Sequence, residues 1–352
     1  MFAYVGGYTT PDRNGRGNGI NVYRVDPVNG AWSHIQTIGG LENPALFTLT
    51  RDSTRLYSVH GGRNLISAFA REKSTGKLTL LNQVDCQGNN PVDSALDPTE
   101  RFLVVANYGT GAVAVMPVAA DGRLLPVSQI VQLQGEPGPN LGEQASSHPH
   151  AVIFDPSGHY VIVPDKGLDR TFLFRFQDGR LTPTDQGSVQ SAPGAAPRHT
   201  TIHPSLPVLY VNNELDSTVT MFDWVAGRAT ERQVISTLPP NHAEPNTTAE
   251  IVVSPCGRRL YVSNRGQDSI VRFAIAPGSG SGRLTYANSV STGGVRPRFF
   301  TLGPDAKQLY AANQDSDDIV VFDIDSPSGN LVPTGVQIEV GSPSAISFVT
   351  PS

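Results

Sequence analysis

Histidine, arginine and glutamate side chains stand at repeated positions of this chain, beside the ends of short apolar strands. His150, Arg198 and Arg298 each follow a proline that opens such a strand, whereas Glu214 and Arg265 follow an asparagine that closes one. Guanidinium groups bind phosphate or carboxylate through charge-assisted hydrogen bonds, and an imidazole can exchange protons near neutral pH. If the fold brings these residues together, they could bind and transform a small anionic molecule.

A repeat must position these residues. Seven copies of a short strand, typified by LYVSN, recur about every 51 residues. The copies are FAYVGG, LYSVH, LVVAN, VIVPD, LYVNN, LYVSN and LYAAN. An alternating strand and then a more polar third strand follow each copy, and a Pro-led strand with a tight turn precedes the next one. Four antiparallel strands per unit, repeated seven times, predict an all-β, seven-bladed β-propeller.

The two ends of the chain supply complementary parts of one blade. The first strand, FAYVGG, has no Pro-led strand before it, and the last segment, SPSAISFVT, is a Pro-led strand with no LYVSN copy after it. Pairing of these two strands would close the ring and remove the free sheet edges. We therefore expect residues 1–352 to form one propeller domain, closed by its N- and C-terminal strands.

Hairpin geometry predicts which residues share one face of the disc. In an antiparallel hairpin, the start of the first strand lies beside the end of the second, so residues at these places gather on one rim around the axis. The rim set is Asp93, His148, His150, Arg198, His199, Glu250, Arg298, His60, Asn107, Asp165, Glu214, Arg265 and Gln314. Because the segments around residues 44–64 have few polar strand starts, we expect the site to lie toward the blades built from residues 90–315.

A structural interpretation of the rim stands beside the functional one. Some rim residues could satisfy backbone groups between blades instead of binding a ligand. These are His60, Asn107, Asp165, Asn264 and Asn313. Glu214 and Glu250 could likewise be simple ion-pair partners. The arginines 198, 265 and 298 are harder to explain in this way, because like charges near a narrow axis repel one another unless an anion or acid lies between them.

Composition excludes several classes of protein. The net charge of −5 argues against nucleic acid or an anionic membrane as the main partner. No signal-like start or long apolar run is present, so we expect a cytoplasmic protein without a membrane partner. Cys86 and Cys256 are interpreted as buried free thiols. The common nucleotide, zinc-protease, serine-hydrolase and calcium motifs are missing, so we predict neither metal nor cofactor. Nothing indicates the oligomeric state, and we expect a monomer or weak dimer.

The sequence resembles the propeller lactonase family, which groups bacterial 6-phosphogluconolactonases with fungal 3-carboxy-cis,cis-muconate lactonizing enzymes. The resemblance covers essentially the whole chain and is strongest in HPHAVIFDPSGHYVIVPDKGLDR, APRHTTIHP, LYVNNELDSTVTMF, AEIVVSPCGRRLYVSNRGQDSIVRF and RPRFFTLGPDAKQLYAANQDSDDIVVF. It implies a metal-independent site of one histidine, two arginines and one glutamate. By motif, the histidine is His148 or, as blade alignment favours, His150, and the other three are Arg198, Glu214 and Arg265.

The resemblance also implies hydrolysis of a sugar-acid lactone, with 6-phosphogluconolactone as the expected substrate. The arginines would bind the anionic group and the oxyanion, His150 would act as general base, and Glu214 would orient a group or exchange protons with the leaving hydroxyl. The predicted binding set is completed by His148, His199, Glu250, Arg298, Gln314, Asn107 and Asp165. The same residues could serve a cycloisomerase acting on a carboxymuconate. A non-catalytic binding platform is the third alternative, which a charged rim of small-ligand size does not favour.

Overall fold

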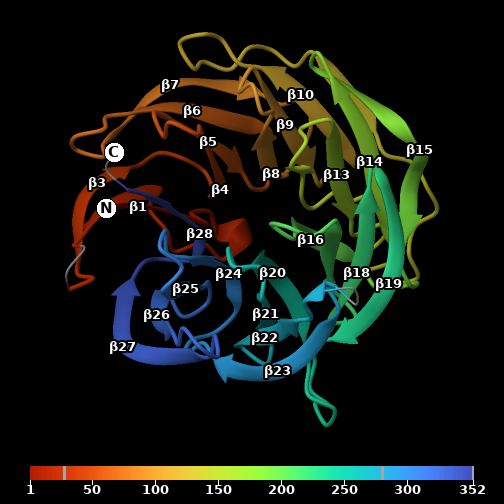
Figure 1. Ribbon diagram of the computed structural model, residues 1–352. Coiled ribbons are helices and arrows are strands. Elements are labelled where there is room, and N and C mark those ends of the chain that lie inside the picture. Colours follow the sequence, from red (N-terminus) through yellow and green to blue (C-terminus); the bar gives the residue numbers. More distant parts are fainter. Residues whose placement is uncertain (27–28, 279–280, 351–352) are drawn as a thin grey trace.

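Seven four-stranded sheets form a ring in the computed structural model, which describes residues 1–26, 29–278 and 281–350 (Figure 1). All the pairings between neighbouring strands in these sheets are antiparallel, and within each sheet the strands follow one another outward from the axis. The predicted all-β, seven-bladed propeller is therefore confirmed. The Pro-led strands lie innermost, as the sequence pattern predicts.

The blades are numbered from the one that joins the chain ends. Blade 1 contains β28 (Pro343–Val349), β1 (Phe2–Gly7), β2 (Ile20–Val25) and β3 (Trp32–Ile38). Blade 2 contains β4 (Pro44–Leu49), β5 (Arg55–His60), β6 (Leu65–Arg71) and β7 (Leu78–Asp85). Blade 3 contains β8 (Pro91–Leu96), β9 (Phe102–Asn107), β10 (Ala112–Pro117) and β11 (Gln129–Gln132). Blade 4 contains β12 (Ile153–Phe154), β13 (Tyr160–Asp165), β14 (Arg170–Gln177) and β15 (Arg180–Gln190).

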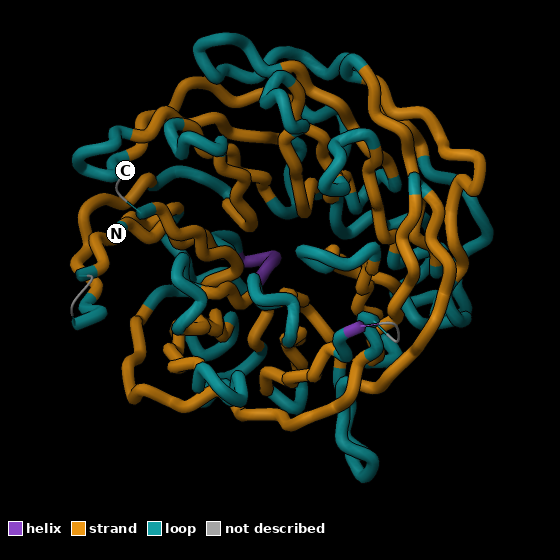
Figure 2. Tube along the Cα trace, in the orientation of Figure 1, coloured by secondary structure: helices purple, strands orange, loops and turns teal. Residues whose placement is uncertain are grey.

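The remaining blades follow the same order. Blade 5 contains β16 (Pro197–Ile202), β17 (Val208–Asn213), β18 (Thr218–Val225) and β19 (Arg228–Ser236). Blade 6 contains β20 (Thr247–Val253), β21 (Arg259–Arg265), β22 (Ser269–Ile275) and β23 (Leu284–Ser291). Blade 7 contains β24 (Pro297–Leu302), β25 (Gln308–Asn313), β26 (Asp318–Ile324) and β27 (Leu331–Glu339). A short 3-10 helix, η1 (Pro11–Arg13), stands between β1 and β2 and lies beside the disc axis, purple in Figure 2.

The chain ends close the ring as predicted. In blade 1, β1 pairs with β2 on one side and with β28 on the other, with Val5 opposite Ile346 in the second ladder. The innermost strands β28, β4 and β24 are neighbours around the axis, so the closing blade is integrated on both sides. Neither edge of β1 is left unpaired, which removes a template for unwanted strand addition.

The hydrophobic core lies mainly between neighbouring blades. Val104 and Val113 of blade 3, for example, belong to one buried cluster with Val161 and Phe174 of blade 4. A sheet that is covered on both faces by its neighbours cannot bury its apolar side chains alone, so the seven blades stabilise one another around the ring.

Tyrosines of the second strands link neighbouring blades. The hydroxyl of Tyr4 donates to the carbonyl oxygen of Gly76, in the outer hairpin of the next blade, at 2.8 Å. Equivalent bonds join Tyr57 to Gly122 at 3.0 Å, Tyr210 to Gly282 at 2.6 Å, and Tyr261 to Gly329 at 2.8 Å. The accepting glycines have φ between 76° and 91°, a left-handed conformation that other residues adopt only with strain. In these four copies of the LYVSN pattern, the tyrosine therefore connects one blade to the next.

A bulge follows the first residue of the innermost strand in most blades. In blade 5, Pro197 pairs with Asn213 but His199 pairs with Asn212, so Arg198 has no partner in the ladder. The same one-residue shift follows Pro44, Pro91, Pro297 and Pro343. Strand pairing does not fix the direction of a bulged residue, so its side chain can be directed toward the axis.

The innermost strand of blade 4 is shorter than the sequence pattern predicts. Regular pairing covers only Ile153–Phe154, and Pro149 forms an isolated bridge with Asp165. The backbone N–H of Val152 donates to Oδ2 of Asp93, in blade 3, at 2.9 Å. This bond between blades removes the donor from the ladder, which explains the irregular start of the strand.

The prediction that both cysteines are buried is wrong for one of them. Cys86 is buried, but Cys256 is exposed. Cys256 lies in the SPCG turn between β20 and β21, where the chain reverses at the surface and the side chain is exposed. The two thiols are free.

The contact between blades 1 and 2 leaves no room for a side chain at Gly6. A Cβ added there would lie 2.2 Å from the carbonyl oxygen of Pro44, so backbone atoms would have to move. We expect Gly6→Ala to lower the free energy of unfolding by about 1–3 kcal/mol, the usual cost of overpacking. Gly39→Ala is the control, because the nearest atom to its Cβ is 3.8 Å away. Equal midpoints of denaturant unfolding for the two variants would contradict this packing argument.

Candidate active site

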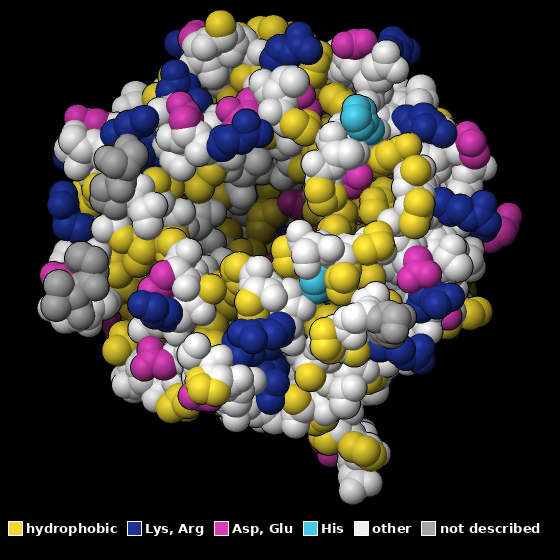
Figure 3. Space-filling model, viewed as in Figure 1, with side chains coloured by type: hydrophobic (Ala, Val, Ile, Leu, Met, Phe, Trp, Pro, Cys, Tyr) yellow, Lys and Arg dark blue, Asp and Glu magenta, His cyan; other side chains and the backbone are white. Residues whose placement is uncertain are grey.

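A small pocket on the propeller axis is lined mainly by the bulged residues and their neighbours. One face of the disc is visibly hollowed around the axis (Figure 3). The lining residues that follow the first residue of an innermost strand are Ser344, Ala45, Val92, Arg198 and Arg298, together with His150 at the equivalent position of blade 4. The enclosed space of about 20 Å³ is roughly enough for one water, so a larger ligand must extend from it toward the rim.

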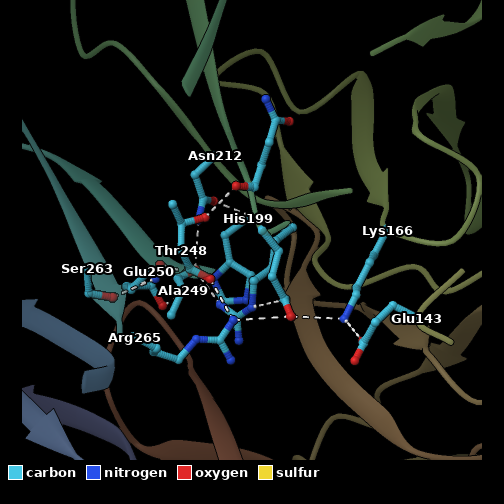
Figure 4. A network of polar contacts seen from close by, with 12 residues as sticks. Glu143, Lys166, His199, Asn212, Thr248, Ala249, Glu250, Ser263 and Arg265 are labelled. Atoms are coloured by element: carbon cyan, nitrogen blue, oxygen red, sulfur yellow. Dashed lines mark hydrogen bonds and ion pairs between the residues drawn. The ribbon is translucent and has the colours of Figure 1, made fainter. Parts of the chain in front are cut away.

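Glu214 is the centre of an ion cluster beside this pocket. Its Oε1 lies 2.9 Å from Nζ of Lys166 and 3.2 Å from an Nη atom of Arg265, and its Oε2 lies 3.1 Å from Nε of Arg198. In Figure 4, Lys166 and Arg265 reach into the network from opposite sides. Lys166 also contacts Glu143 at 2.6 Å. Three cations of blades 4, 5 and 6 thus share one buried carboxylate.

Backbone carbonyl groups hold the two arginines of this cluster. Arg265 donates to the carbonyl oxygen of Thr248 at 2.7 Å, and Arg198 donates to that of Ala249. Both arginines are almost fully buried, with exposures of 6% and 2%. They stand at the end of β21 and in the bulge of β16, so the hairpins of two neighbouring blades direct them to the same point.

The charges of the cluster shift the pKa values of its members. Burial would raise the pKa of Glu214, but Arg265, Lys166 and Arg198 hold it well below its usual range. Burial and the nearby Arg265 and Arg298 lower the pKa of Arg198 to about 9. At neutral pH the carboxylate is therefore ionised and Arg198 is still a cation. The cluster has more positive than negative groups, which favours the binding of an anion.

His150 is kept neutral by its surroundings. Burial, Arg198, His199, Arg298 and Lys166 all lower its pKa, which lies well below the usual value. Its Nδ1 is buried and has no hydrogen-bond partner among the described residues. A neutral imidazole with an unused nitrogen, in a pocket lined by cations, can accept a proton from water or substrate.

His199 and Glu250 form a second pair at the pocket. Nδ1 of His199 lies 3.0 Å from a carboxylate oxygen of Glu250, and the ring centre of His199 is 5.2 Å from that of His150. Burial and Arg198 lower the pKa of His199, whereas Glu250 raises it. The hydrogen bond to Glu250 fixes the orientation of this ring beside His150.

The two histidines of the HPH motif have different surroundings. The ring of His148 is stacked on Tyr108, with centres 4.4 Å apart, and its Nδ1 lies 2.9 Å from the carbonyl oxygen of Tyr108. His148 is partly buried outside the axial pocket, whereas His150 lines that pocket. The geometry therefore favours His150 over His148 as the residue that meets a ligand at the axis.

Asn107 and Asp165, predicted as binding residues, are fully buried and are not brought to the pocket. Asp165 accepts from the hydroxyl of Ser147 at 2.5 Å and from the backbone N–H groups of His148, Gly167 and Leu168. Oδ1 of Asn107 accepts from the thiol of Cys86 at 3.1 Å. These contacts match the structural alternative for strand-end residues.

Arg298 and Gln314 extend the charged region toward blade 7. Arg298 lines the axial pocket and also an adjoining one, which Gln314 lines as well. Gln314 directly follows β25, one residue beyond the buried Asn313. Of the predicted site residues, His150, Arg198, Glu214, Arg265, His199, Glu250 and Arg298 are gathered around the axial pocket.

Sequence reasoning missed Lys166 and Tyr108. It selected the last position of the LYVSN pattern in blades 2, 3 and 4, but the following residue in blades 5, 6 and 7. In blades 3 to 7, one consistent register would have selected the residue directly after the pattern, which is Tyr108, Lys166, Glu214, Arg265 and Gln314. The same reasoning placed the site toward residues 90–315, yet Tyr8, Ala45 and Ser344 also line the axial pocket. Tyr8 lies in the loop after β1, which carries no repeat signal, whereas Ala45 and Ser344 occupy the repeat position of Arg198 with small side chains.

Within the described ranges, no group of three or more His, Cys, Asp or Glu side chains is arranged to hold a metal ion. The positive groups that face the pocket are side chains of the protein.

Comparisons with known proteins place this site in context. A family model described as lactonase, seven-bladed β-propeller, matches residues 2–348. A 6-phosphogluconolactonase from Bacillus subtilis is 35% identical over 306 residues, which are 86% of this chain and 84% of that protein. A 6-phosphogluconolactonase from Formosa agariphila is 29% identical over 305 residues, 83% and 84% of the two chains. The structure of a periplasmic gluconolactonase from Pseudomonas aeruginosa matches with a TM-score of 0.92 and 32% identity, over 100% of this chain and 99% of that one.

Removal of the shared carboxylate should destabilise the fold. Glu214→Gln leaves Lys166, Arg198 and Arg265 without a common counter-charge, and we expect a loss of about 3–5 kcal/mol in the free energy of unfolding. Added inorganic phosphate should raise the melting temperature of this variant more than that of the wild type, because an anion replaces the lost charge. Glu231→Gln, on the exposed edge strand β19, is the control and should stay within about 0.5 kcal/mol of wild type. A Glu214→Gln protein as stable as this control would contradict the role of the cluster.

Proposed function

This chain belongs to the seven-bladed β-propeller lactonase family, and on that premise we propose that it hydrolyses 6-phosphogluconolactone to 6-phosphogluconate. As a member of that family it is a carboxylic-ester hydrolase that acts on a lactone. The specific substrate is inferred from the B. subtilis and F. agariphila relatives, which are named 6-phosphogluconolactonases.

The observation that carries this proposal is the excess of cations around a neutral imidazole. Arg198, Arg265 and Lys166 surround one carboxylate, and His150 stands beside them with an unpaired ring nitrogen. An anionic ester that enters such a pocket finds donors for its developing oxyanion and a base for its attacking water.

We infer the following reaction. Water attacks the carbonyl carbon of the lactone while His150 accepts a proton from that water, and a guanidinium group of Arg198 or Arg265 stabilises the oxyanion. The intermediate then collapses by breaking the bond between the carbonyl carbon and the ring oxygen, which takes the proton from His150. The product is a hydroxy acid, whose carboxyl group releases one proton to solvent.

Glu214 serves this reaction as an orienting group. Its pKa is held well below the usual range, so it stays ionised and is a poor donor or acceptor of protons near neutral pH. Its three ion pairs instead fix the directions of Arg198, Arg265 and Lys166. Of the two roles that the sequence suggested for Glu214, orientation fits this charge state.

The cytoplasmic location stays a prediction. None of the described helices is long and apolar enough to cross a bilayer. The related gluconolactonase from P. aeruginosa is periplasmic by its own description.

Proton release with fresh 6-phosphogluconolactone tests the proposed activity. With a chelator present, the purified protein should open the lactone well above the spontaneous rate. A carboxymuconate is tested in parallel, since the same arginines would bind its carboxylates, and its ultraviolet absorbance should not change. A rate of lactone opening no higher than the spontaneous rate would refute the proposal. Turnover of the muconate would favour a cycloisomerase.

The pH profile tests the role of His150. Because its pKa lies well below the usual value, His150 stays unprotonated through the pH range in which an ordinary histidine gains a proton, and it becomes protonated only in more acidic solution. We expect kcat/KM to stay level through that range, around pH 6.5, and to decline as the pH falls further. His150→Asn should reduce kcat by about 10²–10⁴-fold, the usual contribution of a general base. His159→Asn, on an exposed turn, is the control for this variant. A decline of the wild-type kcat/KM that begins above pH 7 would refute His150 as the general base.

A further inference from the structure

A second pocket adjoins the axial pocket and has a volume of about 370 Å³. The two pockets share Tyr8 and Arg298 in their linings, and the second one is also lined by Arg13, Arg296 and Gln314. It is formed by the loop that contains η1, near the axis in Figures 1 and 2, and by the rim of blade 7. The arginine-rich pocket therefore lies directly beside the axial pocket, with Tyr8 and Arg298 between them.

The loop after β1 is held in place from two sides. Oδ1 of Asn43, in the segment before β4, accepts from the backbone N–H groups of Thr9 and Thr10 at 2.8 and 3.1 Å. On the opposite side, Arg16 donates to Oδ2 of Asp317 at 2.5 Å and to the carbonyl oxygen of Gln314 at 2.9 Å. These bonds tie the loop to blades 2 and 7, so Arg13 is presented from an ordered backbone.

Arg13 and Arg298 stand beside the same aromatic ring, and neither forms an ion pair with a carboxylate of the described residues. Their guanidinium carbons lie 5.8 and 5.4 Å from the ring centre of Tyr8. No ion pair or side-chain hydrogen bond joins either of them to another described residue. Two cations beside one ring, without a carboxylate between them, make a site that an anion would stabilise.

The carboxylates at this pocket already have cationic neighbours. Asp12 lies 3.7 Å from an Nη atom of Arg63, and Asp315 lies 4.0 Å from Nε of Arg296. Asp12 also interacts electrostatically with Arg13, but without an ion-pair contact, so Arg13 and Arg298 can both still form hydrogen bonds to a ligand. The loose contact of Arg296 can likewise be exchanged for one with a ligand.

Gln314 adds a buried polar group to the same lining. Its side chain is 8% exposed, and its Oε1 is buried without a hydrogen-bond partner among the described residues. Rotation of a carboxamide exchanges its oxygen and nitrogen, so Gln314 can present either an acceptor or two N–H donors to a ligand. A polar group buried without a partner is costly unless a ligand or water satisfies it.

We propose that this second pocket binds the phosphate group of the substrate while the lactone ring lies at the axial pocket. The inference rests on the proposed function and adds the chemical feature that separates a phosphorylated lactone from an unphosphorylated one. In the δ-lactone of 6-phosphogluconate the carbonyl carbon and the carbon that carries the phosphate-bearing CH₂ group flank the ring oxygen, so the phosphate lies only a few bonds from the reacting carbonyl, which fits two adjoining pockets. The axial arginines are less suited to the phosphate, because Arg198 and Arg265 already contact Glu214 and backbone carbonyl groups.

Binding of the two reaction products provides a test that does not depend on catalysis. Isothermal titration should show that the wild-type protein binds 6-phosphogluconate more tightly than gluconate. Arg13→Gln and Arg296→Gln should each reduce this preference, Arg13→Gln by about 10- to 100-fold, since hydrogen bonds to charged groups contribute this much to affinity. Arg232→Gln is the matched control, because Arg232 lies on the outer strand β19 and pairs with Asp223 at 3.3 Å.

The same variants are compared in hydrolysis of 6-phosphogluconolactone and glucono-δ-lactone. The ratio of kcat/KM for the two lactones should fall in Arg13→Gln and stay at the wild-type value in Arg232→Gln. The proposed phosphate site would be refuted if the wild type bound 6-phosphogluconate and gluconate equally well. It would also be refuted if Arg13→Gln, with an unchanged melting temperature, kept the wild-type preference for 6-phosphogluconate. If neither lactone is hydrolysed but the binding preference is present and sensitive to Arg13→Gln, the pocket stands and the proposed hydrolysis fails.

Discussion

Three cations share one buried carboxylate, and both the arrangement and the charge of the axial site depend on this contact. Lys166, Arg198 and Arg265 come from three neighbouring blades, and each is directed toward Glu214 by the end of a strand or by a bulge. Burial of the carboxylate without these partners would cost several kcal/mol of free energy, and the cations would repel one another without the carboxylate. The contacts thus hold three blades in register and at the same time leave a surplus of positive charge beside the axis.

That surplus explains the different states of the neighbouring groups. His150 faces the cations, none of the described carboxylates pairs with it, and its pKa is well below the usual value. The otherwise similar His199 has Glu250 beside it, which offsets part of the same effect. Two imidazoles whose ring centres are only 5.2 Å apart can therefore play different parts, one as a proton acceptor and the other as an oriented wall of the pocket.

The sequence predicts the repeat, the closure by the chain ends and the positions of most charged groups, because hairpin pairing converts position in the repeat directly into position on the rim. It is less informative where a contact between blades replaces strand pairing. The hydrogen bond from Val152 to Asp93 shortens the innermost strand of blade 4, and no local sequence pattern predicts this bond. The loop around Arg13 was also missed, since it belongs to no repeat. Lys166 was missed because the rim residue of blade 4 was taken one position too early in the repeat. Cys256 was misplaced because the general tendency of free cysteines to be buried was applied to a residue that lies in an exposed hairpin turn.

The bulge at the start of the innermost strands has a consequence for how such a protein can change over generations. Each bulged residue contributes a side chain to the axis without taking part in the ladder, so its identity is largely independent of the hairpin that carries it. The ring therefore offers a set of positions, one for each blade with this bulge, at which single substitutions can alter ligand preference while the scaffold is retained. Ala45, in blade 2, already stands at such a position with only a methyl group. A larger or charged residue there would give descendants of this chain a route to substrates of another shape or charge.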